Sequence, residues 1–227
     1  MGAGKFDDRG VKIDFQRALT APEGAQEVLL VRHGACEPPA ADGLIDGRSD
    51  PVLNERGRAE ATAVAGRLSG MPLAAVFASP MRRAAETAAP TAAEHGLEAQ
   101  LLPDLREIYL GEWEGHGIHE RGARGDEELA RVFSEQNWGL IPGAEPLGDF
   151  AVRVRRGVEQ VADAASDGTV SVAFTHSAVI AEFCRQITNS DAFAFLYNSN
   201  GSVTRLFRMP DDRWMLISYN ETEHILK

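Results

Sequence analysis

Short apolar runs alternate along the chain with longer segments whose apolar residues recur every three or four positions. The clearest run is Val-Leu-Leu-Val at residues 28–31, which is short, uninterrupted and partly β-branched. Runs of this kind are typical of strands that are buried on both faces of a parallel sheet. The pattern predicts four such strands, at residues 28–31, 73–78, 100–102 and 169–174.

The segments between these runs predict helices with one buried face. Asn54 is placed to cap the first of them, and Gly96 to end the second. In the third, one face carries only apolar residues, namely Phe150, Val154, Val158 and Val161. The predicted helices span residues 54–70, 81–95, 147–165 and 178–187.

The pattern changes near the end of the chain. Residues 202–208 and 214–219 alternate apolar and polar positions on either side of Pro210-Asp211-Asp212. This alternation predicts a closing pair of strands joined by a turn. With the alternating strands and helices before it, the chain is expected to form one α/β domain, a three-layer α/β/α sandwich around a mainly parallel sheet.

Two segments fall outside this alternation. Residues 1–26 are mixed and polar, and they predict an N-terminal extension ahead of a folded domain at residues 27–227. Residues 103–145 are long and irregular, with one helix predicted at residues 127–135. Long connections of this kind are often functional, so we expect this one to form a lid insertion over the strand ends.

The charge balance limits the partners of the chain. Its 227 residues include 34 acidic and 23 basic side chains, which gives a net charge of −11. Nucleic acids and anionic membrane surfaces both require a basic footprint, so neither is an expected partner. Any pocket for an anion must then be a local basic island on an acidic protein.

The cysteines and the N-terminal residues indicate the cellular compartment of the protein. Two cysteines, Cys36 and Cys184, are too few for a disulfide framework, and they predict free thiols in a reducing compartment. The first 26 residues lack the apolar stretch of a signal peptide, and no run approaches transmembrane length. These features predict a cytoplasmic protein.

Three of the predicted strands are followed directly by basic or imidazole side chains. Arg32-His33-Gly34 follows the first strand, and Thr175-His176-Ser177 follows the last of the four. Arg82 and Arg83 lie at the start of the helix after the second strand. One such residue alone is more often structural, but ligands of open α/β sheets bind outside the carboxyl ends of the strands. The repetition at one edge therefore predicts an anion site.

The beginning of the predicted lid adds carboxylates, namely Glu107, Glu112 and Glu114. Two arginines and two histidines can surround a dianionic phosphoryl group, and a neutral imidazole can attack its phosphorus. A carboxylic acid can protonate the leaving oxygen and later accept a proton from water. This chemistry requires no metal and no other cofactor. The residue types alone do not choose among the three glutamates or between the two adjacent arginines.

With these motifs the sequence resembles the histidine phosphatase superfamily, which has the phosphoglycerate mutase-like fold, over roughly residues 27–220. The resemblance rests on four motifs in the family's order, at Arg32-His33-Gly34, residues 79–88, residues 105–115 and His176. It implies that His33 is the nucleophile that becomes phosphorylated. It also implies that Arg32 and His176 hold the phosphoryl oxygens, with His176 counted among the catalytic residues.

The same resemblance resolves the two open choices. It selects Arg83 over Arg82 as the phosphate-binding arginine, and it selects Glu107 over the other glutamates as the proton donor. Residues 142–145, Pro-Gly-Ala-Glu, also resemble a turn of the family.

The chain departs from the family pattern at two points. After Gly34 it continues with Ala35-Cys36, where relatives often carry polar residues that touch the phosphate. Arg48 is the candidate substitute, although a salt bridge that stabilises its loop is an equal alternative. Ser177 follows His176 where many relatives have glycine, and it could donate to the phosphate or cap the following helix.

The expected function is that of a metal-independent phosphatase that acts on small phosphomonoesters. A phosphoglycerate mutase is the first alternative, but it must hold a second anion, and residues 107–122 offer only Arg121 as a basic side chain. A catalytically inactive protein that binds a phosphorylated ligand is the second alternative. A homodimer is left open by the sequence, and the sequence does not identify the physiological substrate.

Overall fold

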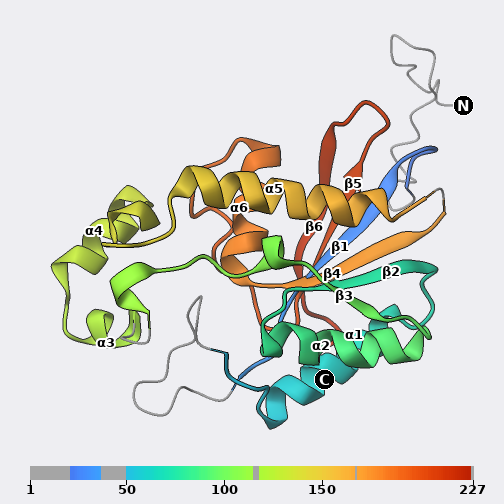
Figure 1. Cartoon of the computed structure of the whole chain (residues 1–227), viewed down its shortest axis with the longest axis horizontal. Helices are drawn as coiled ribbons and strands as arrows, with labels where there is room; N and C mark the ends of the chain where they lie inside the picture. The colour runs from blue at the N-terminus through green and yellow to red at the C-terminus, as the bar shows by residue number, and fades with distance from the viewer. Residues whose placement is uncertain (1–20, 37–49, 115–117, 167, 226–227) are drawn as a thin grey trace, which may run out of the picture.

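The computed structural model describes residues 21–36, 50–114, 118–166 and 168–225. In this part of the chain one sheet contains six strands: β1 (Gln26–Arg32), β2 (Leu73–Ala78), β3 (Ala99–Leu101), β4 (Val170–Thr175), β5 (Val203–Arg208) and β6 (Trp214–Glu221). Their order is β3-β2-β4-β1-β5-β6 (Figure 1). The first four pair in parallel and the last two are antiparallel, which confirms the mainly parallel sheet.

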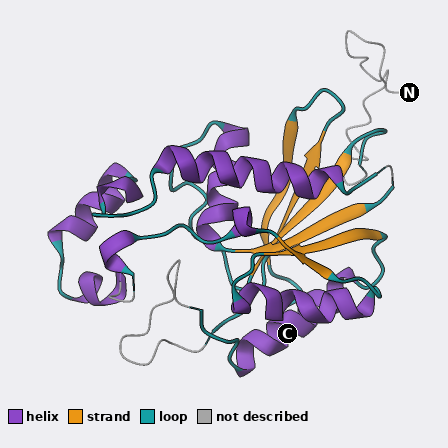
Figure 2. Ribbon diagram, in the orientation of Figure 1, coloured by secondary structure: helices purple, strands orange, loops and turns teal. Residues whose placement is uncertain are grey.

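Helices cover both faces of this sheet (Figure 2). One face carries α1 (Glu55–Leu68) and α2 (Arg82–Glu94), and the other carries α5 (Leu147–Asp163) and α6 (Ser177–Thr188). Successive side chains of β1 enter different cores: Val28 and Leu30 pack on the α5 side, and Leu29 and Val31 on the α1 side. A strand buried on both faces needs apolar residues at every position, which is the pattern of residues 28–31. The three-layer sandwich is therefore confirmed.

The helix boundaries follow the local signals in the sequence. The side chain of Asn54 accepts a hydrogen bond from the Gly57 N–H and caps α1. Gly96 follows α2 with a φ of 64°, a left-handed conformation that favours glycine. The four apolar residues predicted on one face of α5 are all buried, at 3% exposure or less. The main differences are small, since α1 ends before residue 70 and β3 begins one residue earlier than predicted.

The irregular segment at residues 103–145 contains several short elements. They are the 3₁₀ turns η2 (Pro103–Leu105), η3 (Gly111–Trp113) and η4 (Trp138–Leu140), and the helices α3 (Ile118–Ala123) and α4 (Glu127–Glu135). Helix α4 has the predicted bounds, and Asp126 caps it. Figure 1 shows α3 and α4 at one end of the molecule, beyond the edge at which β1 and β4 end.

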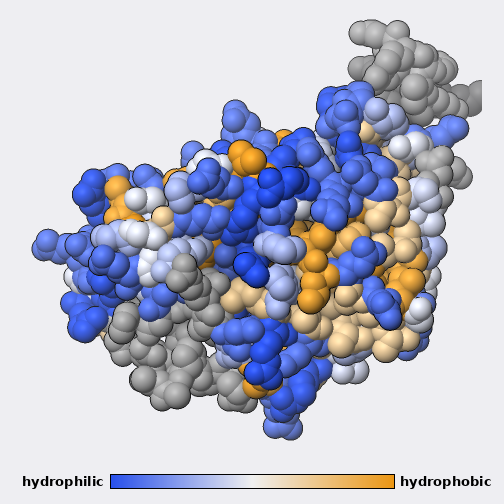
Figure 3. Space-filling view, in the orientation of Figure 1, coloured by the Kyte–Doolittle hydropathy of each residue, from blue (hydrophilic) through white to orange (hydrophobic). Residues whose placement is uncertain are grey.

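The surface is mostly hydrophilic on the face drawn in Figure 3, and apolar side chains gather there toward the edge of the sheet that β3 forms. Leu101 of this edge strand is 54% exposed. Among the helices that the structure describes, none combines the length and the apolar character required to cross a lipid bilayer. Most of the predicted N-terminal extension, residues 1–20, lies outside the described residues.

The loop after β1 packs tightly against the start of α1. A Cβ atom on Gly57 would lie 1.9 Å from the carbonyl oxygen of Ala35, and one on Gly34 would lie 2.6 Å from the carbonyl oxygen of Gly57. Distances this short are not tolerated between a Cβ atom and a backbone oxygen. The two glycines therefore allow α1 to pack directly against the residues that follow His33.

We expect Gly57→Ala to lower the free energy of unfolding by about 1–3 kcal/mol, because the added methyl group has no space and must displace backbone. Gly66→Ala in the same helix is the matched control, since nothing lies within 4 Å of its added Cβ. That control should raise the free energy of unfolding by about 0.5–1 kcal/mol, the usual gain on replacing a helical glycine. Urea unfolding measures both changes. A Gly57→Ala protein as stable as the wild type would contradict the close approach.

Candidate active site

Two histidines meet at the carboxyl edge of the sheet. Arg32, the last residue of β1, is paired with Thr175, the last residue of β4, so His33 and His176 follow neighbouring strands at the same level. The His33 N–H donates to the carbonyl oxygen of Thr175 at 2.9 Å. The two imidazole rings are buried, and their centroids are 5.2 Å apart.

The hydrogen bonds of His33 show which ring nitrogen is free. Its Nδ1 lies 2.8 Å from the carbonyl oxygen of Gly34, a group that can only accept. In the neutral ring the proton therefore resides on Nδ1, and Nε2 carries the lone pair. Nε2 is thus the atom of His33 that can attack an electrophile.

The loop that carries His33 is held from several elements. The Gly34 N–H donates to Thr87 Oγ1 at 3.0 Å, and the Thr87 hydroxyl in turn donates to the carbonyl oxygen of Arg83. The Ala35 N–H donates to Glu60 Oε2 at 2.8 Å. On the other side, Asn200 Nδ2 donates to the carbonyl oxygen of His33 at 3.0 Å. These bonds fix the position of the imidazole before any ligand binds.

Two arginines lie beside the histidines, Arg83 fully buried and Arg32 partly exposed. Arg83, in the first turn of α2, is 0% exposed, whereas its neighbour Arg82 is exposed and pairs with Glu86. Arg32 donates through Nη1 to the carbonyl oxygen of Asn198, and its Nε is buried without a hydrogen-bond partner among the described residues. A buried charge is unfavourable unless an opposite charge meets it, so this cluster is suited to an anion.

His176 presents a second buried nitrogen. Its Nε2 lies 2.8 Å from Ser79 Oγ, which also accepts a hydrogen bond from the Met81 N–H. If the Ser79 hydroxyl donates to Nε2, the imidazole proton resides on Nδ1. Nδ1 is buried and has no hydrogen-bond partner in the described part of the chain, so it is available to a ligand.

Glu107 brings a carboxyl group to the same place. Its Oε2 accepts from the Ala178 N–H at 3.3 Å, and its Oε1 accepts from the Ile108 N–H at 3.0 Å. Ala178 lies in the first turn of α6, two residues after His176. The carboxyl group therefore sits at the N-terminus of this helix, which directly follows His176.

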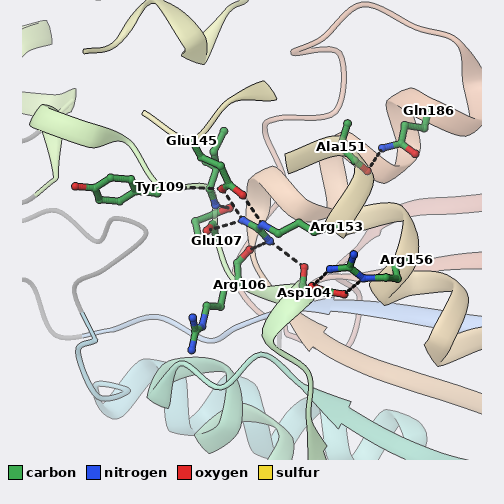
Figure 4. Close-up of polar contacts among 10 residues, drawn as sticks. Asp104, Arg106, Glu107, Tyr109, Glu145, Ala151, Arg153, Arg156 and Gln186 are labelled. Carbon is green, nitrogen blue, oxygen red and sulfur yellow. Dashed lines mark hydrogen bonds and ion pairs between the residues drawn. The ribbon is translucent and has the colours of Figure 1, made fainter. Parts of the chain in front are cut away.

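Arg153 and Glu145 surround the backbone that carries Glu107 (Figure 4). Arg153 donates to the carbonyl oxygens of Asp104, Arg106 and Glu107, and it forms an ion pair with Glu145. Neither residue has a role that the sequence pattern predicts. Arg153 lies 46 positions from Glu107 along the chain, and its helical pattern does not distinguish it from a surface arginine.

The electrostatics of the cluster suit nucleophilic attack. Burial lowers the pKa of His33 well below its ordinary value, and the charges of Arg83 and Arg32 lower it further. Burial and the charge of Arg83 act in the same way on the pKa of His176. Burial raises the pKa of Glu107, although hydrogen bonds and the two arginines oppose this. The site thus combines neutral imidazoles with a carboxyl group that retains its proton more readily than usual.

The structure brings together five of the predicted site residues, namely Arg32, His33, Arg83, Glu107 and His176. Arg48 lies outside the described residues, so its predicted phosphate contact is untested. Ser177 remains a prediction as a phosphate ligand, and its hydroxyl donates to the carbonyl oxygen of Leu196 at 2.6 Å. Its alternative role as the helix cap is wrong, because the N-cap of α6 is His176 and the helix begins at Ser177 itself.

Cys36 lies near His33 without having the features of a reactive thiol. Its Sγ is 3.7 Å from His33 Nδ1, and the residue is 8% exposed. Burial raises the pKa of the Cys36 thiol to about 11, against the opposing effect of the nearby arginines. This environment is that of an inert thiol.

Residues 28–222 match the model of a protein family described as the histidine phosphatase superfamily (branch 1). The metal-independent phosphoserine phosphatase of Arabidopsis thaliana is 32% identical over 203 residues, which cover 88% of this chain and 83% of that protein. The phosphoglycerate mutase-like protein 4 of the same plant is 31% identical, over 88% of this chain and 86% of that protein. The native structure of mycobacterial glucosyl-3-phosphoglycerate phosphatase is similar with a TM-score of 0.72 and 26% identity, and the match covers 86% of this chain and 99% of that one.

Two buried, neutral histidines predict a stability that decreases in mild acid. Their pKa values are lowered on folding, so below the ordinary value of 6.5 the unfolded chain binds more protons than the folded chain. The free energy of unfolding should therefore fall as the pH falls from 6.5 toward the lowered values, by up to about 1.4 kcal/mol per pH unit for each histidine. We expect His176→Gln to have a flatter dependence than the wild type, as measured by urea unfolding at a series of pH values. Equal slopes would contradict a buried, neutral His176.

Proposed function

Because the chain belongs to the histidine phosphatase superfamily, we propose that it hydrolyses small phosphomonoesters through a phosphohistidine intermediate on His33. The observation that carries this proposal is the buried, neutral His33, whose Nδ1 is bound to Gly34, so that Nε2 carries the lone pair near the charges of Arg83 and Arg32. An imidazole in this state is a nucleophile. The adjacent guanidinium groups are the donors that a phosphoryl group requires.

In the first step, His33 Nε2 attacks the phosphorus in line with the ester oxygen. The N–P bond forms, the P–O bond to the leaving group breaks, and the leaving oxygen takes a proton from the Glu107 carboxyl group. In the second step, water attacks the phosphorus of phosphohistidine and transfers a proton to the Glu107 carboxylate. The N–P bond then breaks, and inorganic phosphate leaves.

The negative charge of the phosphoryl group is met by Arg32, Arg83 and His176. Arg32 Nε and His176 Nδ1 are among the buried side-chain atoms that have no hydrogen-bond partner within the described residues, which supports their assignment as phosphate donors. Preorganised donors of this kind stabilise the charge that develops in the transition state. Arg48 and Ser177 are retained as predicted additional contacts to the phosphate.

Hydrolysis is favoured over phosphoryl transfer back to the substrate by the ion pairs of two arginines within residues 103–145. A mutase must hold a second anion, but Arg121 pairs with Asp126 and Glu128, and Arg131 pairs with Glu135. Arg121 also lies over the ring of Trp113, 4.3 Å from its centroid. These two arginines are therefore engaged by the segment itself.

We further propose that residues 103–145 form a lid that selects the alcohol part of the substrate, since they contribute Glu107 to the site and extend past the strand ends. The curated relatives include a phosphatase named for phosphoserine, and a similar structure is named for glucosyl-3-phosphoglycerate. Both are small phosphomonoesters that carry a carboxylate, which makes this class the first to test. A cytoplasmic location and a homodimer stay predictions, the first supported by the free, buried Cys36 and Cys184.

We expect release of phosphate from several small phosphomonoesters, tested with phosphoserine, glucosyl-3-phosphoglycerate and 3-phosphoglycerate in the presence of a metal chelator. His33→Ala should reduce the rate by about 10³-fold or more, because it removes the nucleophile. His95→Ala is the control, since this histidine caps the C-terminal end of α2, opposite Arg83, and its Nε2 lies 3.1 Å from the carbonyl oxygen of Leu68.

The same assays distinguish the alternatives. Isomerisation of 3-phosphoglycerate without release of phosphate would make the protein a mutase. No reaction with any ester would contradict the enzymatic proposal and leave a protein that binds a phosphorylated ligand.

A further inference from the structure

We propose that Arg153, held by Glu145, is a positioning residue for the proton donor Glu107, a proposal that rests on the function proposed above. Arg153 is on α5, and its side chain reaches the first residues of the 103–145 segment (Figure 4). It is directed to the backbone around Glu107 and makes no hydrogen bond to the Glu107 carboxyl group. Arg153 can therefore affect catalysis only by fixing the position of that carboxyl group.

The guanidinium group of Arg153 uses all five of its N–H donors. Nη1 donates to the carbonyl oxygens of Asp104 and Arg106, at 2.9 and 2.7 Å. Nη2 donates to the carbonyl oxygen of Glu107 at 3.1 Å and to Glu145 Oε2 at 2.7 Å, and Nε donates to Glu145 Oε1 at 2.6 Å. A planar fork with five fixed donors is required for this set, and a lysine ammonium group cannot reproduce it.

Glu145 holds the backbone on the other side of Glu107. Its Oε2 accepts from the Tyr109 N–H at 3.3 Å, and its own N–H donates to the carbonyl oxygen of Tyr109 at 2.9 Å. The Glu145 and Arg153 side chains are only 18% and 15% exposed, so their ion pair is largely shielded from water. Together the two residues fix the chain from Asp104 to Tyr109.

The position of this backbone determines where the Glu107 carboxyl group lies. The carboxyl group accepts a hydrogen bond from the Ala178 N–H at 3.3 Å, which is already long for a hydrogen bond. A small shift of the backbone away from Ala178 would therefore break it. A displacement of about 1 Å at a catalytic group can reduce a rate by about 10²-fold. Arg153 thus connects α5 to the geometry of proton transfer.

A proton donor matters most when the leaving oxygen is strongly basic. The alcohol part of an alkyl phosphate such as phosphoserine leaves as an alkoxide unless its oxygen is protonated. The p-nitrophenolate released from p-nitrophenyl phosphate is a stable anion that needs no proton donor. We therefore expect Arg153→Lys to lower kcat/KM for phosphoserine, or for the best alkyl ester found, by about 10²-fold. The loss with p-nitrophenyl phosphate should be only a few-fold. Glu107→Gln should show the same selectivity, and the double variant should lose little beyond Glu107→Gln alone.

Arg156→Lys is the matched control. Arg156 lies one turn further along α5 and forms a bidentate pair with the Asp104 side chain, on the same segment but without a bond to residues 106–107. Its variant should retain the ratio of the two kcat/KM values. Glu145→Gln provides a second test if Arg153→Lys does not fold, because it removes the charge partner and keeps the arginine; the same selective loss, of smaller size, is expected.

The outcomes separate this proposal from the proposed function. Equal losses on both esters in Arg153→Lys or Glu145→Gln, with selective loss in Glu107→Gln, would overturn the positioning role and leave Glu107 as the donor. An Arg156→Lys protein with the same selective loss would also overturn it, since any disturbance of the segment would then suffice. No selectivity in Glu107→Gln would contradict the proton donor itself, and the positioning role would fall with it.

Discussion

The site is organised by two guanidinium charges, one fully and one largely withdrawn from water. Arg83 is fully buried in the first turn of α2, and Arg32 is placed beside it by the end of β1. Burial keeps His33 and His176 neutral by lowering their pKa values, and the two arginine charges add to this, because a further positive charge in the same volume is unfavourable. A dianionic phosphoryl group relieves this accumulation of positive charge. The same constraint thus provides the affinity for the substrate and the neutral state of the nucleophile.

The fold places these groups through backbone connections that allow little movement. β1 and β4 end at the same level, so two residues that are 143 positions apart in the sequence become neighbours as His33 and His176. Gly34 and Gly57 permit α1 to pack against the loop after His33, and Thr87 connects that loop to the backbone of Arg83. The acid comes from a different source, the segment after β3, and it requires support from α5. The residues proposed to bind and attack the phosphate therefore lie at a rigid sheet edge, and the proposed proton donor lies on a separately held segment.

Much of this arrangement was accessible from the sequence because it depends on local signals. The apolar run at residues 28–31, the Asn54 cap and the Gly96 stop each specify a short stretch of backbone, and the predicted elements around them are confirmed. The choice of Arg83 over Arg82 came from a family motif; in the structure Arg83 is buried and Arg82 is exposed. The contacts of Arg153 could not be predicted, since they join α5 to carbonyl groups 46–49 positions earlier. The hydrogen bond of Ser177 was equally out of reach, because the Leu196 carbonyl group that accepts it is supplied by a distant loop.

The central claim is that the phosphoryl group passes through His33, and trapping the intermediate tests it most directly. The protein would be mixed with an isotopically labelled phosphomonoester, quenched within milliseconds in alkali, and digested for mass spectrometry. The account predicts a phosphoryl group that is stable to alkali and labile to acid, on the peptide that contains His33 and approaching one per protein molecule. Rapid release of phosphate with no label on that peptide, or label on another residue, would contradict it.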